Sequence, residues 1–213
     1  MNPTLEYLIQ KFNLDINTRP PIEVGQINRT IMTKTLGELG FRVGAEVGVA
    51  QGHHAKVICE NNPQILLYAI DIWDLYPGYE EYSDRIRKYY QEAQERLALY
   101  NCKLVKKFSM AAVEDFADNS LDFVYIDGAH DYKNVAMDIC EWSKKVKVGG
   151  IVFGHDYKRS RGKYRVDVKD VVPSFCYAKE VRPWFVLKND IKDPLFGQDN
   201  PGWMFVRQET DRT

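Results

Sequence analysis

The sequence of 213 residues is poor in the features that mark membrane, secreted and nucleic-acid-binding proteins. No apolar run approaches the roughly 18 residues that cross a bilayer. The formal net charge of −1 leaves no basic surplus for a polyanion. The N-terminal stretch has acidic residues and no basic start, and the four cysteines form no CxxC pair. We therefore expect a cytoplasmic protein with free thiols and with no membrane or nucleic-acid partner.

Internal repeats and linkers are also absent, which excludes repeat architectures. The sequence instead alternates apolar, strand-like runs with helical segments. The expected strands are 45–49, 65–71, 103–108, 121–127, 151–156, 181–187 and 203–207. Near-continuous apolar strands separated by helices predict an α/β fold, with a doubly wound, mostly parallel, seven-stranded sheet and helices on both faces.

The first forty residues differ from this alternating pattern. They are interpreted as an N-terminal helical extension (1–40) that precedes the main domain (41–213), with a break at Arg19-Pro20-Pro21. We expect the extension to cover a pocket or to form a contact in a homodimer.

The most distinctive residues lie at or just after the apolar strands, where ligands bind in parallel sheets. Glu46, Gly48 and Gly52 belong to the first strand and its turn, and glycine there lets the backbone approach a ligand closely. The spacing is G-x-x-x-G, whereas a dinucleotide site would have G-x-G-x-x-G. The turn therefore favours a ligand other than a nicotinamide dinucleotide. A tight strand–helix connection without a ligand is the alternative.

Asp71 ends the second strand, and an acid at this place can accept hydrogen bonds from ribose hydroxyls. Ile72 and Trp73 follow it and could pack against an adenine ring. The alternatives are a helix-capping acid and a core tryptophan. The spacing from the first turn favours the ribose interpretation.

Two further strand ends carry residues that could hold a metal. Asp127 and His130 follow one strand, and His155-Asp156 follows the next. Adjacent strand ends lie about 5 Å apart, so Asp127, His155 and Asp156 could meet at one ion. His130 could act as a general base near neutral pH. Singly, each residue could be a capping acid or a structural histidine.

A run of basic residues follows Asp156 over 158–165. Such a run is usually a solvated loop. Beside an active site it could also steer an anionic acceptor.

Four ordered segments now show a resemblance to a known family. They are AEVGVAQG (45–52), AIDIW (69–73), LDFVYIDGAHDY (121–132) and VGGIVFGHD (148–156). Together they resemble the class I S-adenosylmethionine-dependent methyltransferases, with their Rossmann-like fold. More narrowly they are similar to the macrocin O-methyltransferase branch. The resemblance covers about residues 40–190.

This resemblance implies a role for each matching residue. The cofactor-binding residues would be Glu46, Gly48 and Gly52 around the methionine, Asp71 with Ile72 and Trp73, Ser109 and Met110 near the adenine, and Asp127. A divalent metal, with Mg²⁺ the expected ion, would be held by Asp127 and the His155-Asp156 pair. His155 departs from the family pattern, because nitrogen is a poor magnesium ligand.

The resemblance also implies the chemistry, with Asp127 and His130 as the catalytic residues. A metal-assisted O-methylation is expected on a hydroxyl of a small acceptor, such as a sugar or a nucleotide-linked sugar. The alternatives are a metal-dependent oxygenase or hydrolase that uses Asp127, His155 and Asp156, a nicotinamide-dependent oxidoreductase, and a non-catalytic binding module.

Overall fold

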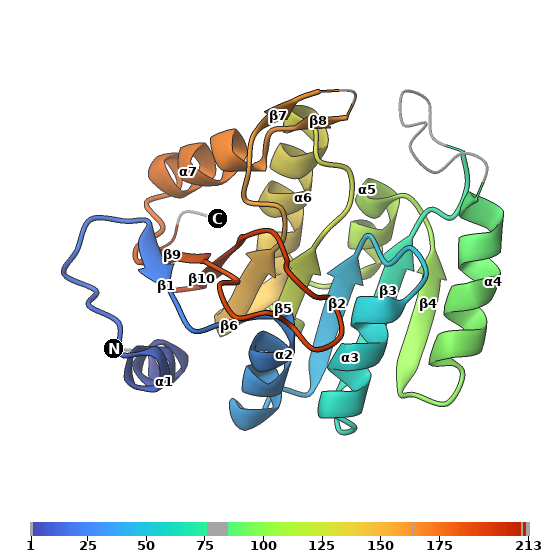
Figure 1. Ribbon diagram of the computed structural model, residues 1–213, viewed down its shortest axis with the longest axis horizontal. Helices are drawn as coiled ribbons and strands as arrows, with labels where there is room; N and C mark the ends of the chain where they lie inside the picture. Colours follow the sequence, from blue (N-terminus) through green and yellow to red (C-terminus); the bar gives the residue numbers. More distant parts are fainter. Residues whose placement is uncertain (1, 76–84, 163, 210, 212–213) are drawn as a thin grey trace.

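The computed structural model describes residues 2–75, 85–162, 164–209 and 211, and its elements form three layers (Figure 1). The central sheet has eight strands in the order β1-β9-β10-β6-β5-β2-β3-β4. Their bounds are β1 Ile22–Val24, β2 Val43–Val47, β3 Leu66–Asp71, β4 Cys102–Lys106, β5 Leu121–Ile126, β6 Val146–Gly154, β9 Trp184–Leu187 and β10 Gly202–Val206. Only β10 runs antiparallel to its neighbours in this described sheet.

Helices cover both faces of the sheet, as Figure 1 shows. One face packs against α1 (Pro3–Phe12), α2 (Arg29–Glu38), α3 (His53–Asn61) and α4 (Ile86–Leu97). The other packs against α5 (Ser109–Ala112), the short 3-10 helix η1 (Val113–Asp115), α6 (Tyr132–Lys145) and α7 (Val168–Ala178). A small hairpin of β7 (Ser160–Arg161) and β8 (Arg165–Val166) lies apart from the sheet. The predicted α/β fold class is confirmed.

The central strands are mostly apolar, with exceptions such as Glu46 of β2 and Asp122 of β5, because both of their faces are buried. All six residues of β5 are buried. Phe123 and Tyr125 belong to the core beneath α1–α4, whereas Val124 and Ile126 belong to the core beneath α5–α7. This alternation is the period of two that a strand imposes. It explains why the strands could be found in the sequence without an alternating polar pattern.

The prediction of seven strands is wrong by one. The additional strand is β1, which pairs in parallel with β9 through Ile22 and Phe185. It is only three residues long, so its pattern of buried Ile22, exposed Glu23 and buried Val24 is too short to be recognised in the sequence. The segment before residue 41 is therefore not wholly helical, and the division at residue 40 stays a prediction.

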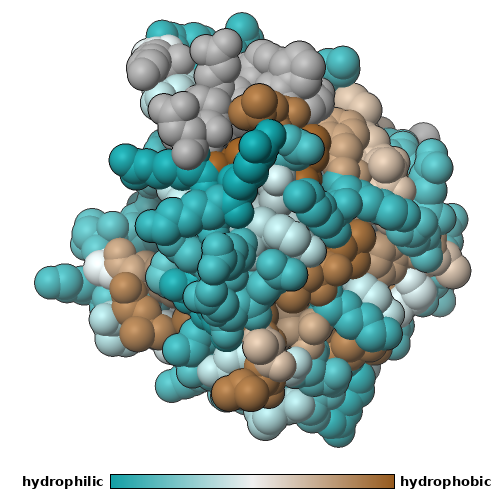
Figure 2. Space-filling model, turned by 90° about the vertical axis from the view of Figure 1, so that its right-hand side faces the viewer, coloured by the Kyte–Doolittle hydropathy of each residue, from teal (hydrophilic) through white to brown (hydrophobic). Residues whose placement is uncertain are grey.

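Polar residues predominate on the side of the molecule that Figure 2 shows. Figure 2 looks onto the side of the molecule near α4 and β4, where hydrophilic side chains surround smaller hydrophobic areas. Helix α4 turns Tyr89, Ala93 and Leu97, spaced four residues apart, toward the core. In the part of the chain that the structure describes, no helix is long and apolar enough to cross a membrane.

The strand order reverses between β2 and β5. From β2 the chain proceeds outward through β3 to β4, and it then returns to the other side of β2 to form β5. A crevice opens at the carboxyl ends of the strands at such a switch point, where open α/β sheets bind ligands.

Candidate active site

A cavity of about 450 Å³ lies at this switch point, within the size range of ligand pockets. Of the residues singled out in the sequence, those that line it are Gly48, Asp71, Ile72, Ser109, Asp127, His130, His155 and Asp156. Those that do not line it are Glu46, Gly52, Trp73 and Met110. Among the lining residues that the sequence did not reveal are Arg29, Asn134, Asp138, Asp199 and Asn200.

The first turn brings bare backbone to the cavity at Gly48. Its φ of 90° lies in the left-handed region, and its N–H donates to the carbonyl of Ile70 at 2.9 Å. A Cβ on Gly48 would stand 2.2 Å from the carbonyl oxygen of Asp127. Gly52 has another role, because a Cβ there would meet Leu97 of α4 at 3.1 Å. Gly48 thus shapes the cavity, while Gly52 lets α4 pack against the start of α3.

The structure does not bring Glu46 to the cavity. Its side chain is 2% exposed and points toward α3, where Oε1 lies 3.5 Å from Nδ1 of His54. Its other oxygen, Oε2, has no partner among the described residues. Burial raises the pKa of this carboxyl. Glu46 lies inside β2 rather than in the turn, so the strand period directs it away from the ligand side.

Asp71 joins the end of β3 to the first turn. Its carboxylate accepts from the backbone N–H of Ala50 at 2.8 Å and from that of Trp73 at 3.0 Å. Burial raises the pKa of Asp71, and these hydrogen bonds oppose the rise. Ile72 lines the cavity, but Trp73 is fully buried and donates to the Ala50 carbonyl at 2.7 Å. The structure thus favours the core alternative for Trp73.

Ser109 begins α5 at the edge of the cavity. Its hydroxyl donates to Asp138 Oδ1 and accepts from the indole N–H of Trp142 at 2.8 Å. The next residue, Met110, packs against the core beneath α5–α7 and does not line the cavity. Of the two residues predicted near an adenine, the structure therefore presents only Ser109.

Asp127, His130 and Asp156 form a compact cluster. The His130 Nε2 atom lies 3.3 Å from Asp127 Oδ1 and 3.1 Å from Asp156 Oδ2. One ligand atom from each residue falls within 4.8 Å of the others, which fits a single bound cation. Burial alone would lower the pKa of His130, but hydrogen bonds to the two carboxylates raise it to about 10. The imidazole therefore stands as the counter-cation of both acids.

His155 lies beside this cluster and is not a member of it. Its Nε2 is 2.9 Å from Asp199 Oδ1, and its Nδ1 is 3.5 Å from Asp156 Oδ1. Burial alone would lower the pKa of His155, but nearby Asp127, Asp156 and Asp199 raise it to about 9. Among the described residues, His130 rather than His155 is grouped with the two acids that were predicted to hold a metal.

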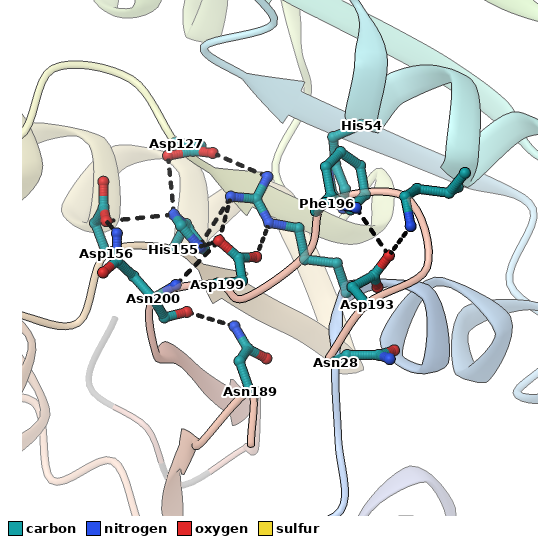
Figure 3. A network of polar contacts seen from close by, with 12 residues as sticks. Asn28, His54, Asp127, His155, Asp156, Asn189, Asp193, Phe196, Asp199 and Asn200 are labelled. Carbon is teal, nitrogen blue, oxygen red and sulfur yellow. Dashed lines mark hydrogen bonds and ion pairs between the residues drawn. The ribbon is translucent and has the colours of Figure 1, made fainter. Parts of the chain in front are cut away.

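The remaining members of the network come from two distant segments (Figure 3). Arg29, the first residue of α2, donates to Asp199, and its Nη1 lies 3.7 Å from Asp127 Oδ2. Its guanidinium also stacks on Phe196, 4.9 Å from the ring centre. Asn200 donates to Asp156 Oδ1 at 2.6 Å. The connection between β9 and β10 thus closes over the ends of β5 and β6.

Asp193 fixes this connection to the start of α2. Its carboxylate accepts from the N–H of Thr30 at 2.9 Å and from the N–H of Leu195 at 2.8 Å. It is 1% exposed. Nothing in the sequence indicated these residues, because Asp193 and Asp199 lie on an irregular segment without strand or helix periodicity.

The basic segment after Asp156 is paired with acids. The Lys158 ammonium lies 3.1 Å from Asp156 Oδ1, Arg159 pairs with Asp170, and Arg161 and Arg165 pair with Asp167. Lys163 lies outside the described residues. The pairs neutralise the positive charges locally, which favours the structural interpretation of this segment over the steering of an anionic acceptor.

The fold and the cavity together define an α/β protein with a ligand site at its switch point. A family model described as "Methyltransferase domain" matches residues 45–157, more than half of the chain. The chain therefore belongs to this methyltransferase family, and the predicted class is confirmed. The family does not favour the oxygenase, hydrolase or oxidoreductase alternatives. The macrocin branch stays a prediction.

Solved structures of similar fold cover nearly the whole chain. Cofactor-bound Rv0187 from MTB has a TM-score of 0.63 at 14% identity and covers 98% of this chain and 92% of its own. An O-methyltransferase from Bacillus cereus in complex with SAH has a TM-score of 0.62 at 15% identity, covering 97% and 92%. The O-methyltransferase TomG from Streptomyces achromogenes, in complex with SAM, has a TM-score of 0.58 at 14% identity, covering 97% and 91%.

One curated protein matches part of the chain. It is the uncharacterized protein y4gI of Sinorhizobium fredii, 28% identical over 97 residues, or 42% of this chain. The chain spans about a tenth of that protein's length, since the match covers 10% of it.

Proposed function

We propose that this protein transfers the methyl group of S-adenosylmethionine to a hydroxyl of a small acceptor. The observation that carries the proposal is one cavity with two different ends. Gly48, Asp71 and Ser109 lie at the ends of β2, β3 and β4, while Asp127 and His130 lie beyond β5. The O-methyltransferases from B. cereus and S. achromogenes, whose structures hold SAH and SAM, support this choice of ligand and reaction.

The residues at the first end fit an adenosine with an attached amino acid. Gly48 brings bare backbone to the cavity wall, and without a Cβ it can pass close to the backbone of Asp127 and Gly128 beyond β5. Asp71 accepts from backbone N–H groups, among them those of Ala50 and Trp73, and because a carboxylate oxygen can accept more than one hydrogen bond it can also serve a ribose hydroxyl. Bound S-adenosylmethionine supplies an electrophilic methyl group on a sulfonium. Ile72 offers an apolar surface beside the adenine.

At the second end, His130 is held in place to take the proton of the acceptor hydroxyl. The new C–O bond forms while the electron pair of the C–S bond stays on sulfur, and the hydroxyl proton moves to His130 Nε2. The Nε2 atom lies 3.3 Å from Asp127 Oδ1 and 3.1 Å from Asp156 Oδ2, so it accepts this proton only when the imidazole is neutral and carries its own proton on Nδ1. General base catalysis of this kind contributes about 10²–10⁴-fold. Polar groups of Arg29, Asp199 and Asn200 line this end, which suits a polyhydroxylated acceptor such as a sugar or nucleotide-linked sugar.

The donor set of Asp127 and Asp156 also fits a divalent cation, with Mg²⁺ the expected ion. Such an ion, when bound, would lower the pKa of an acceptor hydroxyl. Without it, the carboxylates of Asp127 and Asp156 both face His130 Nε2 and favour the protonated imidazole, which raises the pKa of His130. His130 can take a proton only when the two carboxylates are otherwise neutralised. The proposal therefore expects methyl transfer to depend on a divalent cation.

The test is transfer of a labelled methyl group from S-adenosylmethionine to a panel of sugars, nucleotide sugars and catechols. We expect His130→Ala to reduce kcat by about 10²–10⁴-fold. The matched control is His53→Ala, because His53 is exposed and does not line the cavity. Wild-type rates in His130→Ala would remove His130 as the base. A protein that transfers no methyl group to any acceptor and binds no S-adenosylhomocysteine would contradict the proposed function.

A further inference from the structure

Asp138 is a buried acid in the cavity wall that the proposed reaction does not use. It lies on α6, is 4% exposed and lines the cavity. Its Oδ1 accepts the hydroxyl proton of Ser109, and the same hydroxyl accepts from Trp142. The only hydroxyl proton of Ser109 is therefore committed to Asp138. Ser109 thus acts mainly to orient this carboxyl.

The second oxygen of Asp138 is turned to the cavity. Among the described residues, no hydrogen bond or ion pair satisfies Oδ2. A Cβ built on Gly128 would lie 3.5 Å from this atom, which places Oδ2 next to the backbone of the cavity wall. Because Asp138 is otherwise buried and lines the cavity, a ligand donor that reaches Oδ2 would form a charge-assisted hydrogen bond in a poorly hydrated site and gain affinity. Oδ2 is therefore a specificity group for whatever occupies this end.

The position of Asp138 tells which part of the ligand it meets. Ser109 and Phe108 follow β4. Three strands, β5, β2 and β3, separate β4 from β6 in the sheet, and His155 and Asp156 follow β6. Asp138 is thus tied through Ser109 to the β4 side of the cavity, and its Oδ2 lies beside the Gly128 backbone that follows β5. Beside it the lining includes the apolar Ile72 and Phe108, which suit the faces of a flat ring.

We propose that Asp138 selects adenine by accepting a hydrogen bond at Oδ2 from the 6-amino group of the base. This inference rests on the proposed function, because it requires an adenosine ligand. A 6-oxo purine would instead place a carbonyl oxygen against the carboxylate, leaving both acceptors without a donor. The site would thus distinguish adenosine from inosine ligands by one buried contact.

The test compares S-adenosylhomocysteine with S-inosylhomocysteine, which deamination of the first compound produces. Burial raises the pKa of Asp138 to about 7. The calorimetry is therefore done near pH 8, above this pKa, where the carboxyl is mainly ionised. We expect the wild-type protein to prefer the adenine compound by about 10- to 100-fold. Asp138→Asn should reduce this preference to within about threefold, because an amide both donates and accepts.

Two further variants separate recognition from a structural role. Ser109→Ala should also reduce the preference, since it frees Asp138 from its fixed orientation. Asn134 lies one turn earlier on α6 and lines the same cavity, so Asn134→Ala should keep the wild-type preference. An unchanged preference in Asp138→Asn, or equal binding of both compounds by the wild type, would overturn the role of Asp138 alone. Failure of the wild type to bind either compound would overturn the cofactor proposal as well.

Discussion

Substituting Gly48 by alanine tests how the first turn serves the site. At Gly48 the backbone has a φ of 90°, and an added Cβ would stand 2.2 Å from the Asp127 carbonyl oxygen and 2.6 Å from Gly128 Cα. These are backbone atoms, so no side chain can rotate to relieve the contact. Gly40 is the matched control, because it has a φ of 74° and nothing within 4 Å of an added Cβ.

The two substitutions differ in one contribution to the free energy of unfolding, the steric clash. Both place alanine in the left-handed region, which costs about 1–2 kcal/mol. Only Gly48→Ala adds a steric clash, and overpacking of this kind costs about 1–3 kcal/mol. We expect Gly48→Ala to lower the free energy of unfolding by about 2–5 kcal/mol and Gly40→Ala by about 1–2 kcal/mol. Relief of the clash would move Asp127 by about 1 Å, a misplacement that can cost about 10²-fold in rate.

Urea denaturation and methyl-transfer kinetics measure both effects. The midpoint of unfolding should be lower for Gly48→Ala than for Gly40→Ala, and only Gly48→Ala should lose activity beyond its loss of stability. Equal midpoints together with full activity in Gly48→Ala would refute this account of the turn.

Three other predictions concern charge and metal. Because the pKa of Asp138 rises from 3.8 to about 7 on folding, the free energy of unfolding should decrease as the pH rises from about 4 to about 7, by at most about 4 kcal/mol. Urea titrations at several pH values should show that Asp138→Asn lacks this part of the pH dependence. Asp193→Ala should cost about 1–2 kcal/mol, because the N–H groups of Thr30 and Leu195 lose their acceptor; an unchanged melting temperature would contradict this. EDTA should abolish methyl transfer while S-adenosylhomocysteine still binds by calorimetry; full turnover in EDTA would remove the metal from the mechanism.

The parts of the site that could be predicted follow directly from apolar strands. Asp71, Asp127 and Asp156 each come at or just after such a strand, and parallel strands bring their carboxyl ends to one edge. Gly48 was found in the same way. Local sequence was sufficient for these residues because their positions are set by the strand that precedes them.

The remaining residues depend on contacts between distant segments. Arg29 lies at the start of α2, where Asp193 and Asp199, both far along the chain, hold Thr30 and Arg29 in place. Asp199 lies on an irregular connection, where no periodicity marks it. Glu46 does not line the cavity, which the glycine-rich motif alone could not show, because one residue inside the strand decides the face. Its role beside the methionine stays a prediction.

The cofactor end of the cavity carries the central claim, and calorimetric titration with S-adenosylhomocysteine tests it most directly. We predict one site per chain in the wild-type protein. Asp71→Asn should bind at least about tenfold more weakly, because its single carbonyl oxygen must serve Ala50, Trp73 and the ribose. No binding by the wild type at about 1 mM ligand, or equal affinity in Asp71→Asn, would contradict the account.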